Sequence, residues 1–255
     1  MQLVDSHCHI NLLDSPDAML VNARSAGIKH FLCPGVDLKT TADVLAVADK
    51  HADVSASIGI HPNELESISV DQLLKLASHP KVVALGETGL DYYRLEDHDP
   101  SIQQNNFRHH IRAARELKKP LIIHTRDARE DTIKLLKEEK ANEVGGVMHC
   151  FTENWEMAEQ AMALNFYISF SGIVTFKNAI ELQAIAKQVP LDKMLIETDA
   201  PWLAPMPYRG KPNEPQYVLY VAQKMAELRE VSVETISEAT TQNFFTIFKS
   251  AKRTF

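Results

Sequence analysis

The sequence predicts an α/β protein with a TIM-type (β/α)8 barrel, and two observations support this. Eight short apolar runs recur along the chain, and stretches with helical periodicity separate them. Such continuous apolar runs are typical of parallel strands that are buried on both faces. Eight strand–helix units in series close one barrel of about 250 residues, and this chain has 255.

The expected strands share an apolar, β-rich composition and lie at residues 3–9, 30–35, 54–60, 82–87, 121–125, 145–150, 166–172 and 194–199. The first helix is expected to begin after Ser15, with Pro16 in its first turn, and to stop at Gly27. Apolar spacing predicts further helices at residues 101–118, 127–139, 154–164, 178–188, 215–229 and 232–249.

The chain is expected to form one domain, residues 1–255, because no linker or low-complexity tract divides it. A doubly wound open sheet is the alternative fold, and it is less favoured because no glycine-rich phosphate fingerprint follows the first strand. No apolar run approaches the roughly 20 residues that span a bilayer, and the N-terminus lacks the pattern of a signal peptide. Three cysteines without a CxxC pair favour reduced thiols in a cytoplasmic protein. No membrane contact and no obligate protein partner are expected.

The formal net charge of −7 argues against a large basic groove for duplex DNA. Any contact with nucleic acid is therefore expected to be local, through a few Arg and Lys side chains or through bound metal.

Residues that can ligate metal recur at the carboxyl ends of the expected strands. In a (β/α)8 barrel these ends form one rim, and active sites are built there. Each residue alone has an ordinary explanation, such as a packed histidine or a helix-capping carboxylate. Together they predict a metal site in the mouth of the barrel. The candidate ligands are His7, His9, Glu87, His124, His149 and Asp199.

Four histidines and two carboxylates exceed what one tetrahedral ion accepts. Two divalent cations bridged by Glu87 are the economical arrangement, suited to phosphoryl displacement. Mg²⁺ or Mn²⁺ is favoured, and Zn²⁺ is the alternative that imidazole ligands also suit. Glu87 and Asp199 are the catalytic candidates, and Asp199 could also accept a proton from the attacking water.

The chain closely resembles the TatD family of deoxyribonucleases over nearly its whole length. The matching segments are VDSHCHIN (4–11), GIHP (59–62), ALGETGLDYY (84–93), PLIIHTRDA (120–128), GVMHCFT (146–152), YISFSGIVTF (167–176), IETDAPWLAP (196–205) and RGKPNEP (209–215). The resemblance implies that one ion is held by His7, His9, Glu87 and Asp199, and the second by Glu87, His124 and His149. It also implies DNA as substrate, with hydrolysis from single-stranded 3′ ends releasing 5′-nucleotides. Trp202 departs from the family pattern, where Tyr is common.

Four side chains are candidates for holding the substrate phosphate. His61 ends the third strand, and Arg126 follows His124 and could grip phosphate with a bidentate fork. Arg209 and Lys211 lie in the long loop after the last strand, a common phosphate-binding region in barrels. The structural alternatives are a surface ion pair for Arg126 and a solvated loop for the last two.

Four aromatic residues and two further carboxylates lie close to the expected rim in the sequence. Tyr92, Tyr93, Phe151 and Trp202 follow strands 4, 6 and 8, where aromatic rings either stack on unpaired bases or pack loops together. Asp5 and Glu197 precede His7 and Asp199 by two residues and are expected to point into the barrel one layer deeper. They either orient the ligand imidazoles or belong to an internal hydrogen-bond network.

Three rival functions stay open at the level of sequence. A small-molecule amidohydrolase on the same barrel commonly uses a carboxylated lysine in strand 4, but Glu87 stands at that place, and Lys81 lies at the wrong end. A D-aminoacyl-tRNA deacylase would keep the metal site and cleave an ester. A non-catalytic binding scaffold is the third reading, since fold alone never establishes activity.

Overall fold

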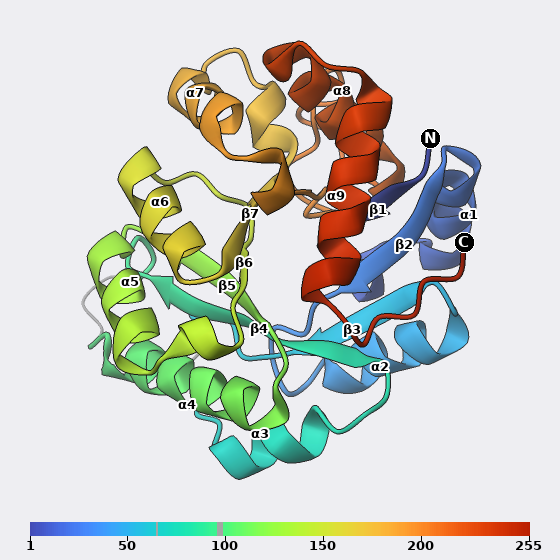
Figure 1. Cartoon of the computed structure of the whole chain (residues 1–255). Coiled ribbons are helices and arrows are strands. Elements are labelled where there is room, and N and C mark those ends of the chain that lie inside the picture. Colours follow the sequence, from blue (N-terminus) through green and yellow to red (C-terminus); the bar gives the residue numbers. More distant parts are fainter. Residues whose placement is uncertain (65, 96–98) are drawn as a thin grey trace.

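The computed structural model describes residues 1–64, 66–95 and 99–255, and it confirms the barrel (Figure 1). Eight parallel strands are hydrogen-bonded in the order in which they occur along the chain. The strands are β1 (Leu3–Asp5), β2 (Ile28–Cys33), β3 (Val54–Ile58), β4 (Val82–Asp91), β5 (Leu121–Arg126), β6 (Gly146–Met148), β7 (Phe166–Phe170) and β8 (Met194–Ile196).

Helices follow the strands and form the outer layer of the barrel (Figure 1). They are α1 (Pro16–Ser25), α2 (Thr41–Lys50), α3 (Val70–Leu76), α4 (Ser101–Leu117), α5 (Arg129–Glu138), α6 (Trp155–Ala163), α7 (Ile180–Gln188), α8 (Val218–Arg229) and α9 (Val233–Ile247). The helices predicted from sequence are present with ends shifted by up to three residues, as is usual for helix termini. Pro16 begins α1 as expected, and Ser15 is its N-cap residue without a side-chain cap bond.

The barrel closes between β8 and β1 through hydrogen bonds at and beyond the carboxyl ends of these short strands. Ser6 N donates to Ile196 O at 3.2 Å, and Asp199 N donates to His7 O at 2.9 Å. A third bond joins His9 N to Ala200 O at 2.8 Å. These bonds hold the segments that carry three of the candidate ligands side by side.

The two-residue period of a strand divides most apolar side chains into two clusters. The exception is Val83 and Ala84, which are consecutive and lie where the pairing of β4 with β3 shifts. The larger cluster lies between strands and helices. The smaller one fills the barrel, and Phe244 of α9 and Phe248, the residue just after that helix, join it. Because α9 also packs against β1 and β8, it covers one end of the barrel and leaves the other for the site (Figure 1). The strand residues of the inner cluster are Val4, Leu32, Val83, Ala84, Ile122, Val147, Tyr167 and Leu195.

The sequence prediction that β4 ends at Glu87 is wrong, because β4 continues to Asp91. Its pairing with β5 shifts between Leu85 and Thr88, so Glu87 lies in an irregular stretch inside the strand. Gly89 has φ +142°, and a Cβ there would overlap the His124 carbonyl. The close approach of β4 to β5 therefore requires glycine and carries Glu87 into the barrel mouth.

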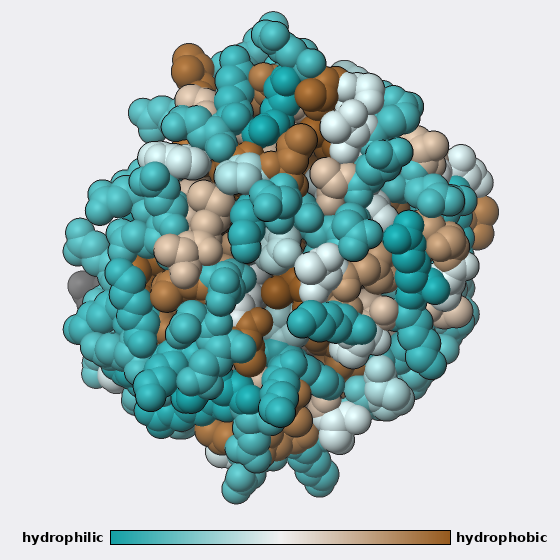
Figure 2. Space-filling model, viewed as in Figure 1, coloured by the Kyte–Doolittle hydropathy of each residue, from teal (hydrophilic) through white to brown (hydrophobic). Residues whose placement is uncertain are grey.

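The visible face of the molecule is covered mainly by hydrophilic residues, with apolar ones scattered in small groups (Figure 2). Among the described residues, none of the helices combines the length and apolar character that crossing a membrane requires.

Candidate metal centre

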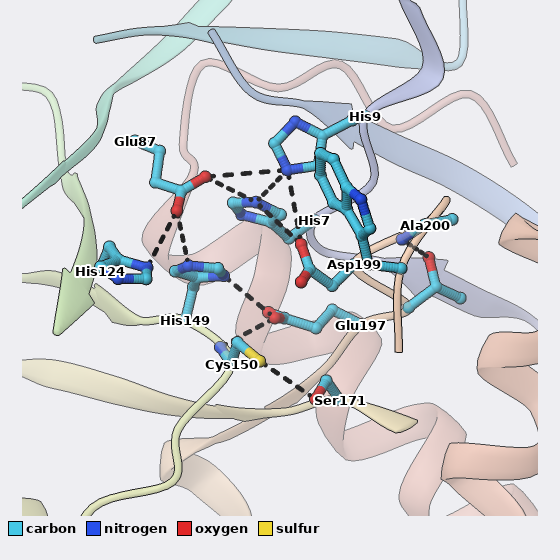
Figure 3. Close-up of polar contacts among 12 residues, drawn as sticks. His7, His9, Glu87, His124, His149, Cys150, Ser171, Glu197, Asp199 and Ala200 are labelled. Atoms are coloured by element: carbon cyan, nitrogen blue, oxygen red, sulfur yellow. Dashed lines mark hydrogen bonds and ion pairs between the residues drawn. The ribbon is translucent and has the colours of Figure 1, made fainter. Parts of the chain in front are cut away.

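Glu87 lies at the centre of the site, and its two carboxylate oxygens face different histidines (Figure 3). Oε2 is 3.2 Å from His7 Nε2 and 3.8 Å from His9 Nε2. Oε1 is 2.9 Å from His149 Nε2 and 3.3 Å from His124 Nδ1. One carboxylate therefore joins two groups of imidazoles that come from opposite sides of the barrel.

Asp199 completes the first group. Its Oδ1 is 3.4 Å from His9 Nε2 and 3.7 Å from His7 Nε2. All six residues chosen from the sequence thus converge in one place, although His7, His9, His149 and Asp199 lie just beyond their strands rather than within them.

His61 joins the second group, which the sequence did not indicate. Its Nε2 is 3.3 Å from Glu87 Oε1, and its ring centroid is 4.4 Å from that of His124. His61 belongs to the GIHP motif, but the distance between His61 and Glu87 depends on how β3 packs against β4.

The electrostatics favour an ionised carboxylate among the imidazoles. Burial by itself raises the pKa of Glu87, but His149, His61 and His124 hold the pKa well below its ordinary value. Burial likewise lowers the pKa of His149, yet the carboxylates of Glu87 and Glu197 raise it well above the ordinary value. Burial and the facing His149 lower the pKa of His7. In the metal-free protein the ionised Glu87 therefore faces a His149 ring that favours its protonated form, and a cation bound here would take the place of that proton.

The donor set fits divalent cations. His7 Nε2 and His9 Nε2 are only 3.3 Å apart, so at most one of them can carry a proton toward the other. Both nitrogens also face Glu87 and Asp199, which leaves lone pairs and carboxylate oxygens crowded together. Within the described chain, three overlapping groups have ligand atoms within 4.8 Å of one another. A cation relieves this crowding, because every one of these atoms is an electron-pair donor.

Two further carboxylates support the histidines from behind. Glu197 Oε1 is 3.2 Å from His149 Nδ1 and also accepts a bond from Cys150 N at 2.8 Å (Figure 3). Asp91 Oδ2 is 3.1 Å from His124 Nε2. Such partners fix ring orientation and raise ligand basicity. Asp91 was missed in the sequence, although it stands in the GLDYY motif four residues after Glu87.

The expected direction of Asp5 is wrong, whereas that of Glu197 is confirmed. Glu197 follows Leu195 of the inner cluster by two residues and bonds Ser169 Oγ inside the barrel. Asp5 follows Leu3, which packs in the outer cluster, and it accepts bonds from the backbone and hydroxyl of Thr198. Asp5 therefore supports the chain just before Asp199 rather than a ligand ring.

The basic candidates are distributed unequally around the site. Arg126 follows His124 on the same side of β5, and its guanidinium lies 3.6 Å from the centroid of the Tyr93 ring. It makes no ion pair with a carboxylate in the described residues. Arg209 stacks over Phe176 at 4.2 Å, and Lys211 is exposed. Neither is seen to contact a candidate ligand within the described ranges.

Only some of the four aromatic candidates are open to a substrate. Phe151 is 2% exposed and belongs to the core. The Tyr92 hydroxyl donates to Asp131, which is a packing role. Tyr93 is 61% exposed but carries Arg126 on one face. Trp202 is 50% exposed, and its ring centroid is 4.8 Å from that of His9.

A barrel with histidines and carboxylates at its rim defines a class of metal-dependent hydrolases. The chain matches the family model described as TatD related DNase over residues 4–249. The chain therefore belongs to the TatD family of metal-dependent hydrolases.

Similar proteins cover almost the whole chain. YcfH of Escherichia coli K12, described as an uncharacterized metal-dependent hydrolase, is 47% identical and covers 97% of this chain and 96% of its own length. YabD of Bacillus subtilis 168, described in the same way, is 42% identical, with 97% and 99% covered. The crystal structure of YJJV, a TatD homologue of Escherichia coli K12, superposes with a TM-score of 0.89 at 30% identity and covers 97% and 98%.

Proposed function

We propose that this protein is a two-metal phosphodiesterase that acts on single-stranded DNA from the 3′ end and releases 5′-nucleotides. The observation that carries the proposal is the position of the Glu87 carboxylate between two groups of histidines. Its Oε2 faces His7 and His9, and its Oε1 faces His124 and His149. A carboxylate placed in this way would be available to two cations, the arrangement that supports in-line displacement at phosphorus.

The proposed ligands divide into two sets. His7, His9, Glu87 and Asp199 would hold the first cation, and Glu87, His124 and His149 would hold the second. Mg²⁺ or Mn²⁺ is the favoured cation, with Zn²⁺ as the alternative. When bound, such cations lower the pKa of water toward neutrality and neutralise charge on the phosphoryl oxygens.

The chain's own residues supply the remaining functions. Burial raises the pKa of the Asp199 carboxyl, but His9 and His7 bring it below its usual value, so the group is ionised. Its free carboxylate is the proposed acceptor of a proton from the attacking water. Arg126, stacked on Tyr93, presents a guanidinium to a phosphate beside the second cation. Glu197 and Asp91 hold the rings of His149 and His124 in place.

The net charge of −7 supports an end of a single strand rather than a long duplex as substrate. Duplex binding depends on many phosphate contacts from a basic surface. Here positive charge at the site comes from Arg126 and from the proposed cations. The description of the matching family as TatD related DNase supports DNA as the polymer.

The test uses purified protein with single-stranded DNA labelled at either end, in Mg²⁺, Mn²⁺ or chelator. We expect early release of a 3′ label as mononucleotide and a shortening ladder from 5′-labelled DNA, both absent with chelator. D-aminoacyl-tRNA and a cyclic amide are tested in parallel. Metal-dependent hydrolysis of either of these, without any release from DNA, would overturn the assignment.

A further inference from the structure

Trp202 is held rigidly beside the candidate ligands while half of its side chain stays open. Its N donates to Asp199 O at 2.9 Å. Its O accepts a 2.6 Å bond from Nδ2 of Asn213, which is fully buried and also donates to Thr198 O. The indole meets the His9 ring at 4.8 Å and 72°. Two hydrogen bonds therefore fix the backbone of Trp202 beside the candidate metal centre, and the edge contact with His9 places the indole against a candidate ligand.

The other aromatic residues of the rim do not offer an equivalent surface. Phe151 is buried, and Tyr92 is hydrogen-bonded to Asp131. Tyr93 lies under Arg126, near the second set of ligands. Among these four, Trp202 alone combines open surface, a fixed backbone and contact with a ligand of the first set.

We propose that Trp202 is a substrate-binding residue whose indole stacks on the nucleobase of the nucleotide whose phosphodiester is hydrolysed. This inference rests on the proposed function. A nucleobase has a planar face that an indole can stack on, and such stacking is tolerant of base identity. Arg126, beside the second set of ligands, would bind the phosphate. The base and the phosphate of the substrate would therefore be bound at separate parts of the barrel mouth.

The kinetic test compares DNA whose 3′-terminal nucleotide has a base with DNA whose terminal residue is abasic. We expect Trp202→Ala to raise KM about 10-fold or more for the natural end, with kcat largely kept, because stacking contributes to binding. The same variant should leave KM for the abasic end nearly unchanged, and Trp202→Phe should recover part of the loss. Trp155→Phe, in α6 and packed on the core, is the matched control.

A binding test needs no turnover. In Trp155→Phe protein, Trp202 is the sole tryptophan, since the chain has two. We expect deoxyadenosine monophosphate to quench its fluorescence in Mg²⁺ buffer and deoxyribose 5-phosphate to leave it unchanged.

The two proposals fail in different ways. Equal KM for natural and abasic ends in the wild type, or equal quenching by both small molecules, would overturn the role of Trp202 while DNA hydrolysis stood. Absence of metal-dependent DNA hydrolysis with every substrate would instead overturn the proposed function.

Discussion

Glu197 Oε1 lies 3.2 Å from His149 Nδ1, on the side of the imidazole opposite to Glu87. The His149 ring is therefore held between two carboxylates, one inside the barrel and one in the mouth. Glu197 is fully buried, and its carboxylate also accepts bonds from Cys150 N and Ser169 Oγ, which hold it in this contact.

We expect Glu197→Gln to weaken metal binding by roughly 10- to 100-fold, since it removes the charge that orients His149 and raises its basicity. Titration of the chelator-treated protein with Mn²⁺ measures the change. Glu156→Gln, an exposed carboxylate on α6, is the control and should bind metal as the wild type does. Unchanged affinity in Glu197→Gln would show that this carboxylate only fills the barrel interior.

Glu87→Ala should abolish DNA hydrolysis while leaving the fold intact. The side chain joins both groups of histidines, so its loss should cost at least about 100-fold in rate. The apolar clusters do not include it, and the thermal unfolding temperature should stay near that of the wild type.

The matched control for this variant is Glu130→Ala, an exposed carboxylate at the start of α5. Metal analysis should find fewer ions bound per molecule in Glu87→Ala than in the control. Full activity in Glu87→Ala would remove the bridging carboxylate from the mechanism.

Arg126→Ala should raise KM for single-stranded DNA about 10-fold, because a guanidinium close to the phosphate contributes mainly to binding. Arg126→Lys keeps the charge but loses the planar stack on Tyr93, so an intermediate KM is expected. Arg129 lies nearby and is already ion-paired with Glu153, which makes Arg129→Ala the control. A larger effect in the control than in Arg126→Ala would contradict the assignment.

Metal-dependent activity should fall below about pH 6.5, as protons compete with cations for the imidazole nitrogens. The direction follows from His149, whose pKa the facing Glu87 and Glu197 raise against the effect of burial in the metal-free protein. Protonation therefore begins at a higher pH for this ring, and metal affinity declines as pH is lowered. Rates and apparent Mn²⁺ affinity measured from pH 8 to pH 5 test this, and a flat profile would contradict imidazole ligation.

The free energy of unfolding should also decrease as the pH is lowered, because of His110, which is not one of the candidate ligands. Burial lowers the pKa of His110 from 6.5 to about 4. Its Nε2 accepts a bond from Ile60 N, and its Nδ1 bonds Asn106 O, so the folded state needs the neutral ring. The unfolded state binds the proton first, and the stabilisation present above pH 6.5 is lost as pH falls toward 4, by roughly 3 kcal/mol.

Urea unfolding at pH 7, 6 and 5 measures this loss, and His110→Gln should show a shallower decline than the wild type. An identical pH dependence in the two proteins would mean that His110 does not titrate differently in the folded and unfolded states.

Much of this architecture was predictable because it depends on local pattern. Continuous apolar runs predicted all eight strands, and the position of His124 in its run placed it correctly on β5. Strand periodicity also predicted that the Glu197 side chain points into the barrel, on the same face of the chain as Leu195 two residues earlier. The same periodicity failed for Asp5, because β1 ends at this residue and the strand period does not continue to His7; Asp5 bonds Thr198 instead.

The sequence by itself determined the repeated strand–helix order and which six residues could ligate metal, because residue type and two- or four-residue spacing are local properties. Only the tertiary structure decided that the two oxygens of Glu87 face different histidines, that His61 joins them, and that Trp202 stays open beside His9. These relations depend on the irregular packing of β4 against β5 and on the bonds that close β8 onto β1. Contacts between residues far apart in the chain carry no signal in any local spacing, so they appear only once the barrel has formed.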